Sequence, residues 1–206
     1  MAAELFSQGG VRGYLHRPAA QTKPARALAM THGAGGYAQG AMLMAMADAL
    51  AARGWLVLRC DLPFRQRRPG GPPRPAEAAA DRAGLREAVE AVRALAPKSC
   101  TITLGGHSYG GRQASMLVAE DSTLVDRLLL CSYPLHPPEQ PEKLRTEHLP
   151  RIAVPTLFVH GTKDSFGSLE EMRAAAALVP NARLEFIAGA GHDLAKGRDL
   201  AFLELL

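Results

Sequence analysis

A serine set among glycines is the first feature of this sequence that could do chemistry. The stretch LGGHSYGG, residues 104–111, places Ser108 directly after the apolar run TITL and among four glycines. Glycine loses much conformational freedom on folding, so it is kept where the backbone turns sharply or another group approaches closely. A serine on such a turn is either a nucleophile or an ordinary turn residue, and the rest of the chain must decide between the two.

A serine hydroxyl is a weak nucleophile at neutral pH, so it needs a base within hydrogen-bonding reach and a third group that fixes the tautomer of that base. Two later segments supply candidates: GTKD ends in Asp164, and GAGH ends in His192. Each has an ordinary alternative, since aspartate is common in turns after strands and histidine in solvated loops. Asp193 is a competing acid, but it is better placed to cap a following helix, and we therefore prefer Asp164.

The elements that must position these residues alternate between strands and helices. Apolar runs predict strands over 11–17, 26–31, 55–60, 100–106, 127–135, 154–161 and 182–189, with an uncertain edge partner near 3–7. Helical spacing and helix formers predict helices over 41–53, 75–96, 109–120, 167–179 and 193–206. Ser168 is the expected N-cap of the fourth helix. The pattern predicts an α/β fold with a mostly parallel sheet of about seven strands and helices on both faces.

The loops that follow the strands carry the polar side chains. Right-handed crossovers place the C-terminal ends of parallel strands at the same edge of a sheet, where ligands bind. HGAGG (32–36) follows the strand at 26–31, and Ser108, Asp164 and His192 follow three later strands in that chain order. A serine, an aspartate and a histidine are therefore expected at one edge of one sheet.

This order and setting resemble the α/β-hydrolase superfamily. Gly106-His107-Ser108-Tyr109-Gly110 matches its G-x-S-x-G nucleophile elbow and lies between a strand and a helix, as that motif requires. Side chains at the two outer positions of the elbow would collide with the strand and the helix, which explains the glycines. The resemblance covers about residues 10–206 and implies one α/β-hydrolase domain over residues 1–206.

More narrowly, the chain is similar to a small branch of uncharacterised hydrolases related to dienelactone-hydrolase-like proteins. The similar segments are SYPLHPP (132–138), PEKLRTEHL (141–149) and PTLFVHGTKDSFG (155–167). Eukaryotic relatives of this branch include a scaffold subunit of a histone acetyltransferase complex. True dienelactone hydrolases use a cysteine nucleophile, so Ser108 argues against lactone ring-opening as the specific reaction. The short segment between the strands at 127–135 and 154–161 leaves no room for a lid domain and predicts an open site.

The resemblance implies a serine hydrolase that cleaves a carboxylic ester or related acyl compound through an acyl-enzyme. Ser108 would attack the carbonyl carbon, His192 would accept its proton, and Asp164 would hold the imidazole. By position, the backbone N–H groups of Ala34 and Tyr109 would stabilise the oxyanion. The alternatives are an acyltransferase or peptidase on the same triad, and a non-catalytic interaction module that retains the fold; an intact triad argues against the last.

A cluster of arginines bears on the substrate. RCDLPFRQRRPGGPPRP, residues 59–75, contains five arginines and begins at the end of a strand. Guanidinium groups bind carboxylate and phosphate bidentately, so Arg65 is the best candidate for binding an anionic group of the substrate. The alternative is a solvated connecting loop.

The remaining histidines have structural interpretations. His32 is expected to shape the loop of residues 32–36, called the oxyanion loop because it contains Ala34. His107 is expected to pack beside the elbow, and His160 to lie behind the catalytic groups. The others are expected at the surface or in loops: His16, His136 and His148. No two histidines have metal-ligand spacing such as H-x-x-x-H, so we expect no metal and no cofactor.

Composition excludes several other classes of protein. Of 206 residues, 47% are hydrophobic and 21% are charged, which is ordinary for a globular domain. The net charge of +4 is concentrated in residues 59–75, too local for a nucleic-acid-binding surface. Three cysteines without CxxC spacing, no signal peptide and no apolar run of membrane-spanning length predict a cytoplasmic protein. Its expected partner is a small-molecule substrate, and a homo-oligomer stays open.

Overall fold

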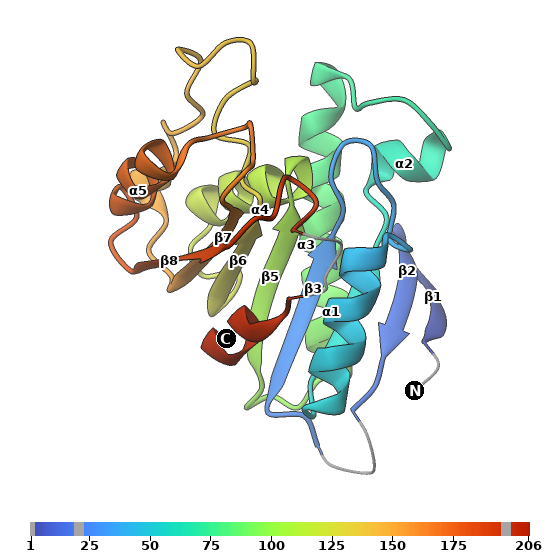
Figure 1. Ribbon diagram of the computed structural model, residues 1–206. Helices are drawn as coiled ribbons and strands as arrows, with labels where there is room; N and C mark the ends of the chain where they lie inside the picture. The colour runs from blue at the N-terminus through green and yellow to red at the C-terminus, as the bar shows by residue number, and fades with distance from the viewer. Residues whose placement is uncertain (1–2, 19–22, 195–198) are drawn as a thin grey trace.

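The computed structural model describes residues 3–18, 23–194 and 199–206, and these form one sheet covered by helices (Figure 1). The strand order in the described residues is β1-β2-β4-β3-β5-β6-β7-β8. The strands are β1 (Glu4–Gln8), β2 (Val11–His16), β3 (Arg26–Thr31), β4 (Leu56–Cys60), β5 (Thr101–His107), β6 (Arg127–Cys131), β7 (Thr156–Gly161) and β8 (Ala182–Ile187). β2 is antiparallel to both β1 and β4, and all other neighbours are parallel, so the sheet is mostly parallel as predicted.

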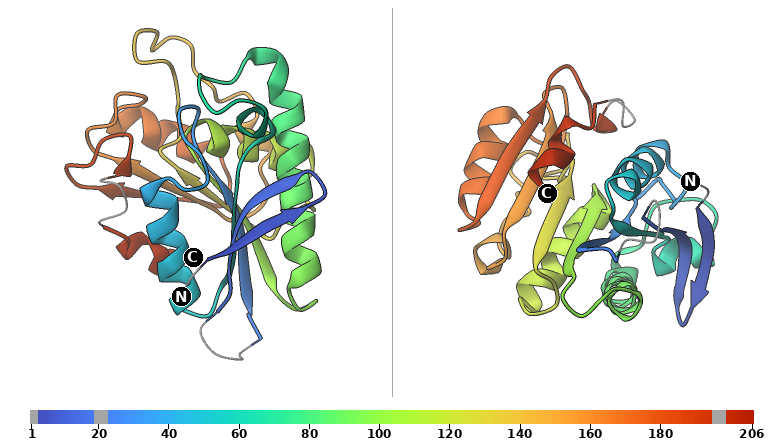
Figure 2. Two further views of the ribbon diagram at one scale, coloured as in Figure 1. Left: turned by 90° about the vertical axis from the view of Figure 1, so that its right-hand side faces the viewer. Right: turned by 90° about the horizontal axis from the view of Figure 1, so that it is seen from below.

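Helices cover both faces of this sheet (Figure 2). They are α1 (Ala41–Ala52), α2 (Pro63–Arg67), α3 (Ala78–Leu95), α4 (Tyr109–Glu120) and α5 (Leu169–Ala177), with 3-10 turns at Pro75–Glu77, Leu149–Arg151 and Ala201–Leu205. Apolar residues of α3, α4 and α5 pack in one core, and those of α1 and the C-terminal turn pack in the other. The described residues thus form an α/β fold with helices on both faces of a mostly parallel sheet, as predicted.

The strands are apolar on both sides because each side faces one of these two cores. In β3, Ala27 and Ala29 pack with α3 and α4, whereas Leu28 and Met30 pack with α1. All four side chains are at most 1% exposed. This double burial explains why the strand reads as a continuous apolar run and why it takes a central place in a parallel sheet.

Several elements differ from the sequence prediction. In the described part of the chain the sheet has eight strands rather than about seven, because residues 4–8 pair with β2 as a regular hairpin. β6 ends at Cys131 instead of 135, since Ser132 turns the chain with a φ of 48°. Part of the helix predicted over 193–206 lies outside the described residues, and its described end is a short 3-10 turn. The α2 helix was not predicted, whereas Ser168 caps α5 as expected, in a reciprocal capping box with Glu171.

Three histidines expected at the surface or in loops are buried: His16, His136 and His148 are 4%, 5% and 7% exposed. His16 accepts a hydrogen bond from Arg59 Nε at 2.9 Å, so its burial is compensated by a polar partner. Cys60, Cys100 and Cys131 are buried and free. Within the described part of the chain, no helix is both long and apolar enough to cross a bilayer.

Between β6 and β7 the chain holds only the turn Leu149–Arg151, and no additional domain is inserted there. This segment and α2 rise above the same edge of the sheet (Figure 1). That edge carries the C-terminal ends of the parallel strands, so both segments border the place where the sequence predicts the functional residues.

Candidate active site

Ser108 lies in a strained turn between β5 and α4. Its backbone has φ 51° and ψ −119°, a conformation that residues with a side chain rarely adopt, and it persists only where the surroundings enforce it. A Cβ at Gly106 would lie 2.5 Å from the carbonyl carbon of Gly110, and one at Gly110 would lie 2.4 Å from the carbonyl oxygen of His32. Both contacts are with backbone that cannot move aside, so the glycines flanking the serine are required by close approach.

The structure brings Ser108, His192 and Asp164 together from three loops. His192 Nε2 lies 2.7 Å from Ser108 Oγ, and His192 Nδ1 lies 2.8 Å from Asp164 Oδ2. The Nδ1–H donates to the carboxylate, which leaves Nε2 to accept the hydrogen bond of the serine hydroxyl. Asp164 therefore occupies the place for which Asp193 was the competing candidate.

Asp164 is held as a carboxylate. Burial by itself would raise its pKa, but the hydrogen bond and charge of His192 and the N–H of Phe166, 3.0 Å from Oδ1, hold the pKa below its usual value. The carboxylate therefore stays ionised at neutral pH and can orient the imidazole and stabilise it when protonated.

The ring and backbone of His192 are fixed by two neighbours. Phe166 stacks on the ring with centroids 4.3 Å apart, and His107 Nε2–H donates to the carbonyl oxygen of His192 at 2.7 Å. Burial lowers the pKa of His107 to about 4, so it stays neutral. His160 lies behind Asp164, with its Nδ1 3.7 Å from Oδ2, as the sequence predicted. These contacts explain how a histidine on a surface loop keeps one orientation.

Ala34 and Tyr109, whose backbone N–H groups were predicted to stabilise the oxyanion, line the same cavity as Ser108. Tyr109 is the first residue of α4, so its N–H has no partner within the helix, and Ala34 N–H has none among the described residues. The carbonyl of Gly33 accepts hydrogen bonds from Gly36 N–H (3.0 Å) and from His32 Nδ1–H (2.8 Å). In a trans peptide the C=O and N–H point to opposite sides, so fixing this carbonyl also fixes the direction of Ala34 N–H.

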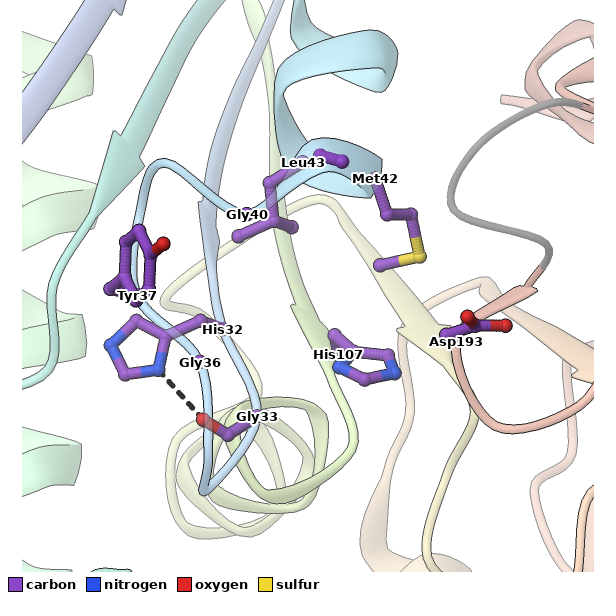
Figure 3. Close-up of a pocket in the computed structure, with 10 residues that line it drawn as sticks. His32, Gly33, Gly36, Tyr37, Gly40, Met42, Leu43, His107 and Asp193 are labelled. Atoms are coloured by element: carbon purple, nitrogen blue, oxygen red, sulfur yellow. Dashed lines mark hydrogen bonds between the residues drawn. The ribbon is translucent and has the colours of Figure 1, made fainter. Parts of the chain in front are cut away.

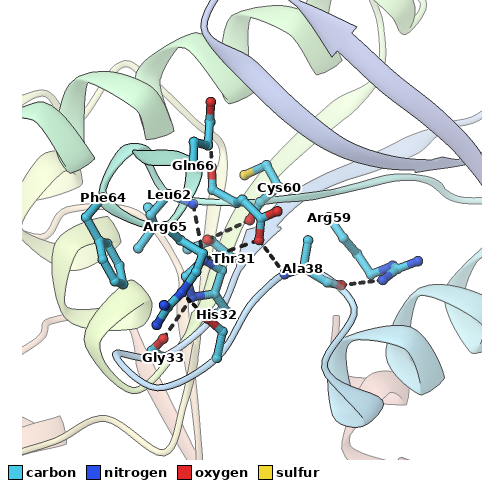
Figure 4. Close-up of polar contacts among 12 residues, drawn as sticks. Thr31, His32, Gly33, Ala38, Arg59, Cys60, Leu62, Phe64, Arg65 and Gln66 are labelled. Carbon is cyan, nitrogen blue, oxygen red and sulfur yellow. Dashed lines mark hydrogen bonds and ion pairs between the residues drawn. The ribbon is translucent and has the colours of Figure 1, made fainter. Parts of the chain in front are cut away.

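His32 anchors this loop to the neighbouring strand end (Figure 4). Leu62 N–H donates to His32 Nε2 at 3.2 Å, which sets the ring as the neutral Nδ1–H tautomer. Burial also lowers the pKa of His32, which favours the neutral ring. Farther along, Ala38 N–H donates to Asp61 Oδ1 at 2.6 Å, and the carbonyl of Ala38 accepts from Arg59. The role expected for His32, shaping the oxyanion loop, agrees with these contacts.

Arg65 has a different environment from the one expected for a substrate ligand. Its side chain is 7% exposed, and it is absent from the wall of the cavity at Ser108. Arg65 Nε donates to Gly36 O (2.8 Å) and Nη2 to Ala34 O (2.9 Å), with further bonds to the carbonyls of Gly71 and Arg68. The guanidinium thus ties the loop of residues 32–36 to the loop after α2, and these contacts favour a positioning role over the predicted substrate-binding role.

The variant Arg65→Gln is therefore expected to lower kcat about tenfold to hundredfold, because the oxyanion loop loses its anchor and small misplacements at a reacting centre are costly. The ratio of KM values for anionic and neutral esters should stay unchanged. Steady-state kinetics with both kinds of ester test this, with Arg67→Gln as control, since Arg67 lies in the same helix and forms only an exposed ion pair with Glu77. A rise in KM for the anionic ester alone would restore the interpretation of Arg65 as a substrate ligand.

Two cavities border the loop of residues 32–36. The first, of about 500 Å³, contains Ser108, Ala34 and Tyr109 in its wall. The second, of about 310 Å³, is mainly apolar and lies toward α1 (Figure 3). Residues that line this second cavity include His32, Tyr37, Met42, Leu43, His107 and Asp193. Because Ser108, Ala34 and Tyr109 all line the first cavity, it is the candidate substrate site.

A second Ser–His pair, which the sequence did not reveal, lies two turns farther along α4. His148 Nε2 is 2.7 Å from Ser115 Oγ, and the Ser115 hydroxyl donates to the carbonyl of Arg112 at 2.8 Å. Ser115 is fully buried, and no acidic partner of His148 occurs among the described residues. Burial and nearby arginines lower the pKa of His148 to about 4. With its proton directed to a helix carbonyl and no carboxylate behind the imidazole, Ser115 is a structural serine.

Comparison with known proteins agrees with this architecture. The family described as "Alpha/beta hydrolase domain" matches residues 24–201, and the chain belongs to this family. Among curated proteins, polyketide synthase ThaQ of Burkholderia thailandensis is 51% identical over 47 residues, which are 23% of this chain and only 2% of that protein.

Several solved structures are similar to this chain over nearly its whole length. Est1E from Butyrivibrio proteoclasticus is 20% identical, with a TM-score of 0.71 over 100% of this chain and 94% of that one. A dienelactone hydrolase from Anabaena variabilis is 18% identical, with a TM-score of 0.73 over 99% and 92%. XC6422 from Xanthomonas campestris, described as a serine hydrolase without lid, is 16% identical, with a TM-score of 0.68 over 95% and 87%. Family and fold together place the chain among the hydrolases.

Proposed function

We propose that this protein is a serine hydrolase that cleaves a carboxylic ester or related acyl compound of small size. The observation that supports it most is the continuous chain of contacts from Asp164 through His192 to Ser108, 2.8 and 2.7 Å long, at the wall of a cavity. Among the described residues, the Ser115 pair has no carboxylate partner, and neither Ser115 nor His148 lines the cavity at Ser108.

In the proposed reaction, Ser108 Oγ attacks the carbonyl carbon of the bound ester while His192 Nε2 accepts the hydroxyl proton. The carbonyl oxygen becomes an oxyanion next to the N–H groups of Ala34 and Tyr109, which stabilise its charge. Collapse of the tetrahedral intermediate breaks the bond to the alkoxy group, and His192 returns the proton to the leaving alcohol. Water then attacks the acyl-enzyme in the same way, releasing the acid and restoring Ser108.

The absence of an inserted domain between β6 and β7 supports an open site for short or compact acyl groups. An acyltransferase or peptidase would use the same three side chains and differ only in the acceptor or leaving group. The cytoplasmic location and the preference for esters stay predictions of this proposal.

Labelling with a fluorophosphonate probe tests the proposal directly. An activated serine attacks the phosphorus and expels fluoride, so we expect rapid labelling of the peptide that contains Ser108 and none at Ser115. Mass spectrometry of the labelled protein separates the two, since Arg112 provides a tryptic cleavage site between them. p-Nitrophenyl esters of graded chain length, together with methyl ferulate, then define the acyl pocket; Est1E is described with ferulic acid bound. No labelling and no ester hydrolysis would favour the non-catalytic interaction module.

A further inference from the structure

Three arginines line the cavity that contains Ser108: Arg74, Arg112 and Arg145. Arg74 is exposed, whereas Arg112 and Arg145 are half-buried. Arg112 lies one helical turn after the serine in α4, and its backbone N–H donates to Ser108 O at 2.9 Å. Residues four apart share one face of a helix, so the side chain of Arg112 lies on the same face as Ser108. Arg145 comes from the segment between β6 and β7 and reaches the same wall.

Neither guanidinium has an acidic partner. Six other arginines of the described chain form ion pairs with carboxylates within 4.0 Å: Arg17, Arg53, Arg67, Arg68, Arg82 and Arg86. No such pair involves Arg112 or Arg145 in residues 3–18, 23–194 and 199–206. The Arg112 side chain contacts the neutral Tyr133 hydroxyl, and its Nε is buried without a hydrogen-bond partner. Arg145 Nη1 donates to the carbonyl of Pro134 at 2.9 Å.

The two positive charges are close enough to repel. The pKa of Arg145 is lowered first by burial and then by the charge of Arg112. Like charges held together in a half-buried wall destabilise the protein unless a counter-charge lies between them. Such an arrangement at a cleft is a sign of a functional site when it coincides with other donors.

Further features show that this wall is built to donate hydrogen bonds. Gln113 is fully buried in the same wall; its Oε1 accepts from Arg82 at 3.1 Å, while its Nε2 has no partner. The backbone of Arg145 is held at both ends, because its N–H donates to Leu135 O (2.8 Å) and its carbonyl accepts from Tyr133 Oη (2.5 Å). The segment that carries Arg145 is therefore fixed at the cavity rather than free to turn away.

We propose that Arg112 and Arg145 form a subsite that binds a compact oxyanion, a carboxylate or phosphate carried by the substrate. This inference rests on the proposed function and adds the substrate class: short esters with a negative group a few bonds from the reacting carbonyl. It also moves the anion site predicted at Arg65 to different arginines, on the face of α4 that presents Ser108.

Kinetics with a matched pair of substrates tests the subsite. p-Nitrophenyl hemisuccinate and p-nitrophenyl butyrate have acyl chains of the same length, one charged and one neutral. Wild-type enzyme should favour the charged ester in kcat/KM, and Arg112→Gln should reduce this preference about tenfold to hundredfold, as expected for losing charge-assisted hydrogen bonds. Arg145→Gln should act in the same direction and serves if the first variant folds poorly. Arg183→Gln is the control, since Arg183 lies on β8 away from this cavity.

Binding to the inactive variant Ser108→Ala separates this inference from the proposed reaction. Calorimetry should show the hemisuccinate ester binding at least about tenfold more tightly than the butyrate ester, and Arg112→Gln in that background should remove the difference. Equal affinities would overturn the subsite even if the wild type hydrolyses both esters. Discrimination in binding without any hydrolysis by the wild type would instead overturn the proposed function and retain the subsite. Competition by monomethyl succinate and by methyl 3-phosphonopropionate shows whether carboxylate or phosphate is preferred.

Discussion

Ser108→Ala is expected to lower kcat for ester hydrolysis by about 10⁴- to 10⁶-fold, the loss typical of removing the nucleophile of a serine triad. The residual rate would come from the N–H groups of Ala34 and Tyr109 and from substrate binding alone. Alanine removes only one oxygen and keeps the strained backbone, with φ 51°, that serine already has. The free energy of unfolding should therefore change little. Stopped and continuous assays with p-nitrophenyl acetate measure the loss.

Ser115→Ala provides a matched control for this prediction. Ser108 lies in the elbow and Ser115 lies in the α4 helix that follows it. Each hydroxyl is 2.7 Å from a histidine nitrogen, and each serine is changed to alanine. Ser115→Ala should keep kcat within a few-fold of wild type, because its hydroxyl is bonded inside the helix and His148 is neutral. If Ser115→Ala were inactive and Ser108→Ala active, with circular dichroism showing both folded, the assignment of the nucleophile would have to be exchanged.

The positions of the proposed catalytic groups could be predicted from the sequence because parallel strands end at one edge of a sheet. Ser108 and Asp164 follow β5 and β7, whose continuous apolar runs reflect burial on both faces of the sheet. His192 follows the partly exposed edge strand β8, and the parallel topology still brings its loop to the same edge. Their catalytic roles remain predictions for the experiments above.

The arginines show where sequence reasoning stops. Five of them lie within residues 59–75. Residue type alone does not distinguish an arginine that is buried and anchors a loop from one that is exposed to solvent. Arg65 is buried because the unpredicted helix α2 turns it toward the carbonyls of the oxyanion loop, a contact made only in the folded chain. Arg112 and Arg145 are 33 residues apart in sequence, and only the segment between β6 and β7, which has no periodic pattern, brings them together.

The same limit applies to the pairing of Ser115 with His148. Serine in the middle of a helix commonly bonds to a preceding carbonyl, and a histidine in an irregular segment reads as exposed. The contact depends on how that segment packs against α4, which no local pattern in the chain encodes.

Asp164→Asn is expected to lower kcat about 10⁴-fold without unfolding the protein, because the amide would select the wrong tautomer of His192. Phe166 N–H donates to Oδ1 of Asp164 at 3.0 Å, so the asparagine oxygen would remain there and its NH₂ group would take the position of Oδ2. That NH₂ would donate to His192 Nδ1, and the ring proton would move to Nε2, which could then no longer accept the proton of Ser108. Fluorophosphonate labelling should slow in parallel with kcat.

Asp193→Asn is the matched control, since Asp193 is the neighbouring acid and lines the other cavity. It should retain most of the activity; a loss as large as that of Asp164→Asn would contradict the assignment. Stability adds an independent measurement. The pKa of Asp164 is lowered in the folded state, so its carboxylate contributes stability that is present above the ordinary pKa of aspartate and is lost as the pH falls through the lowered value. Urea unfolding should therefore show wild type more stable than Asp164→Asn at pH 7, with the difference shrinking below about pH 4.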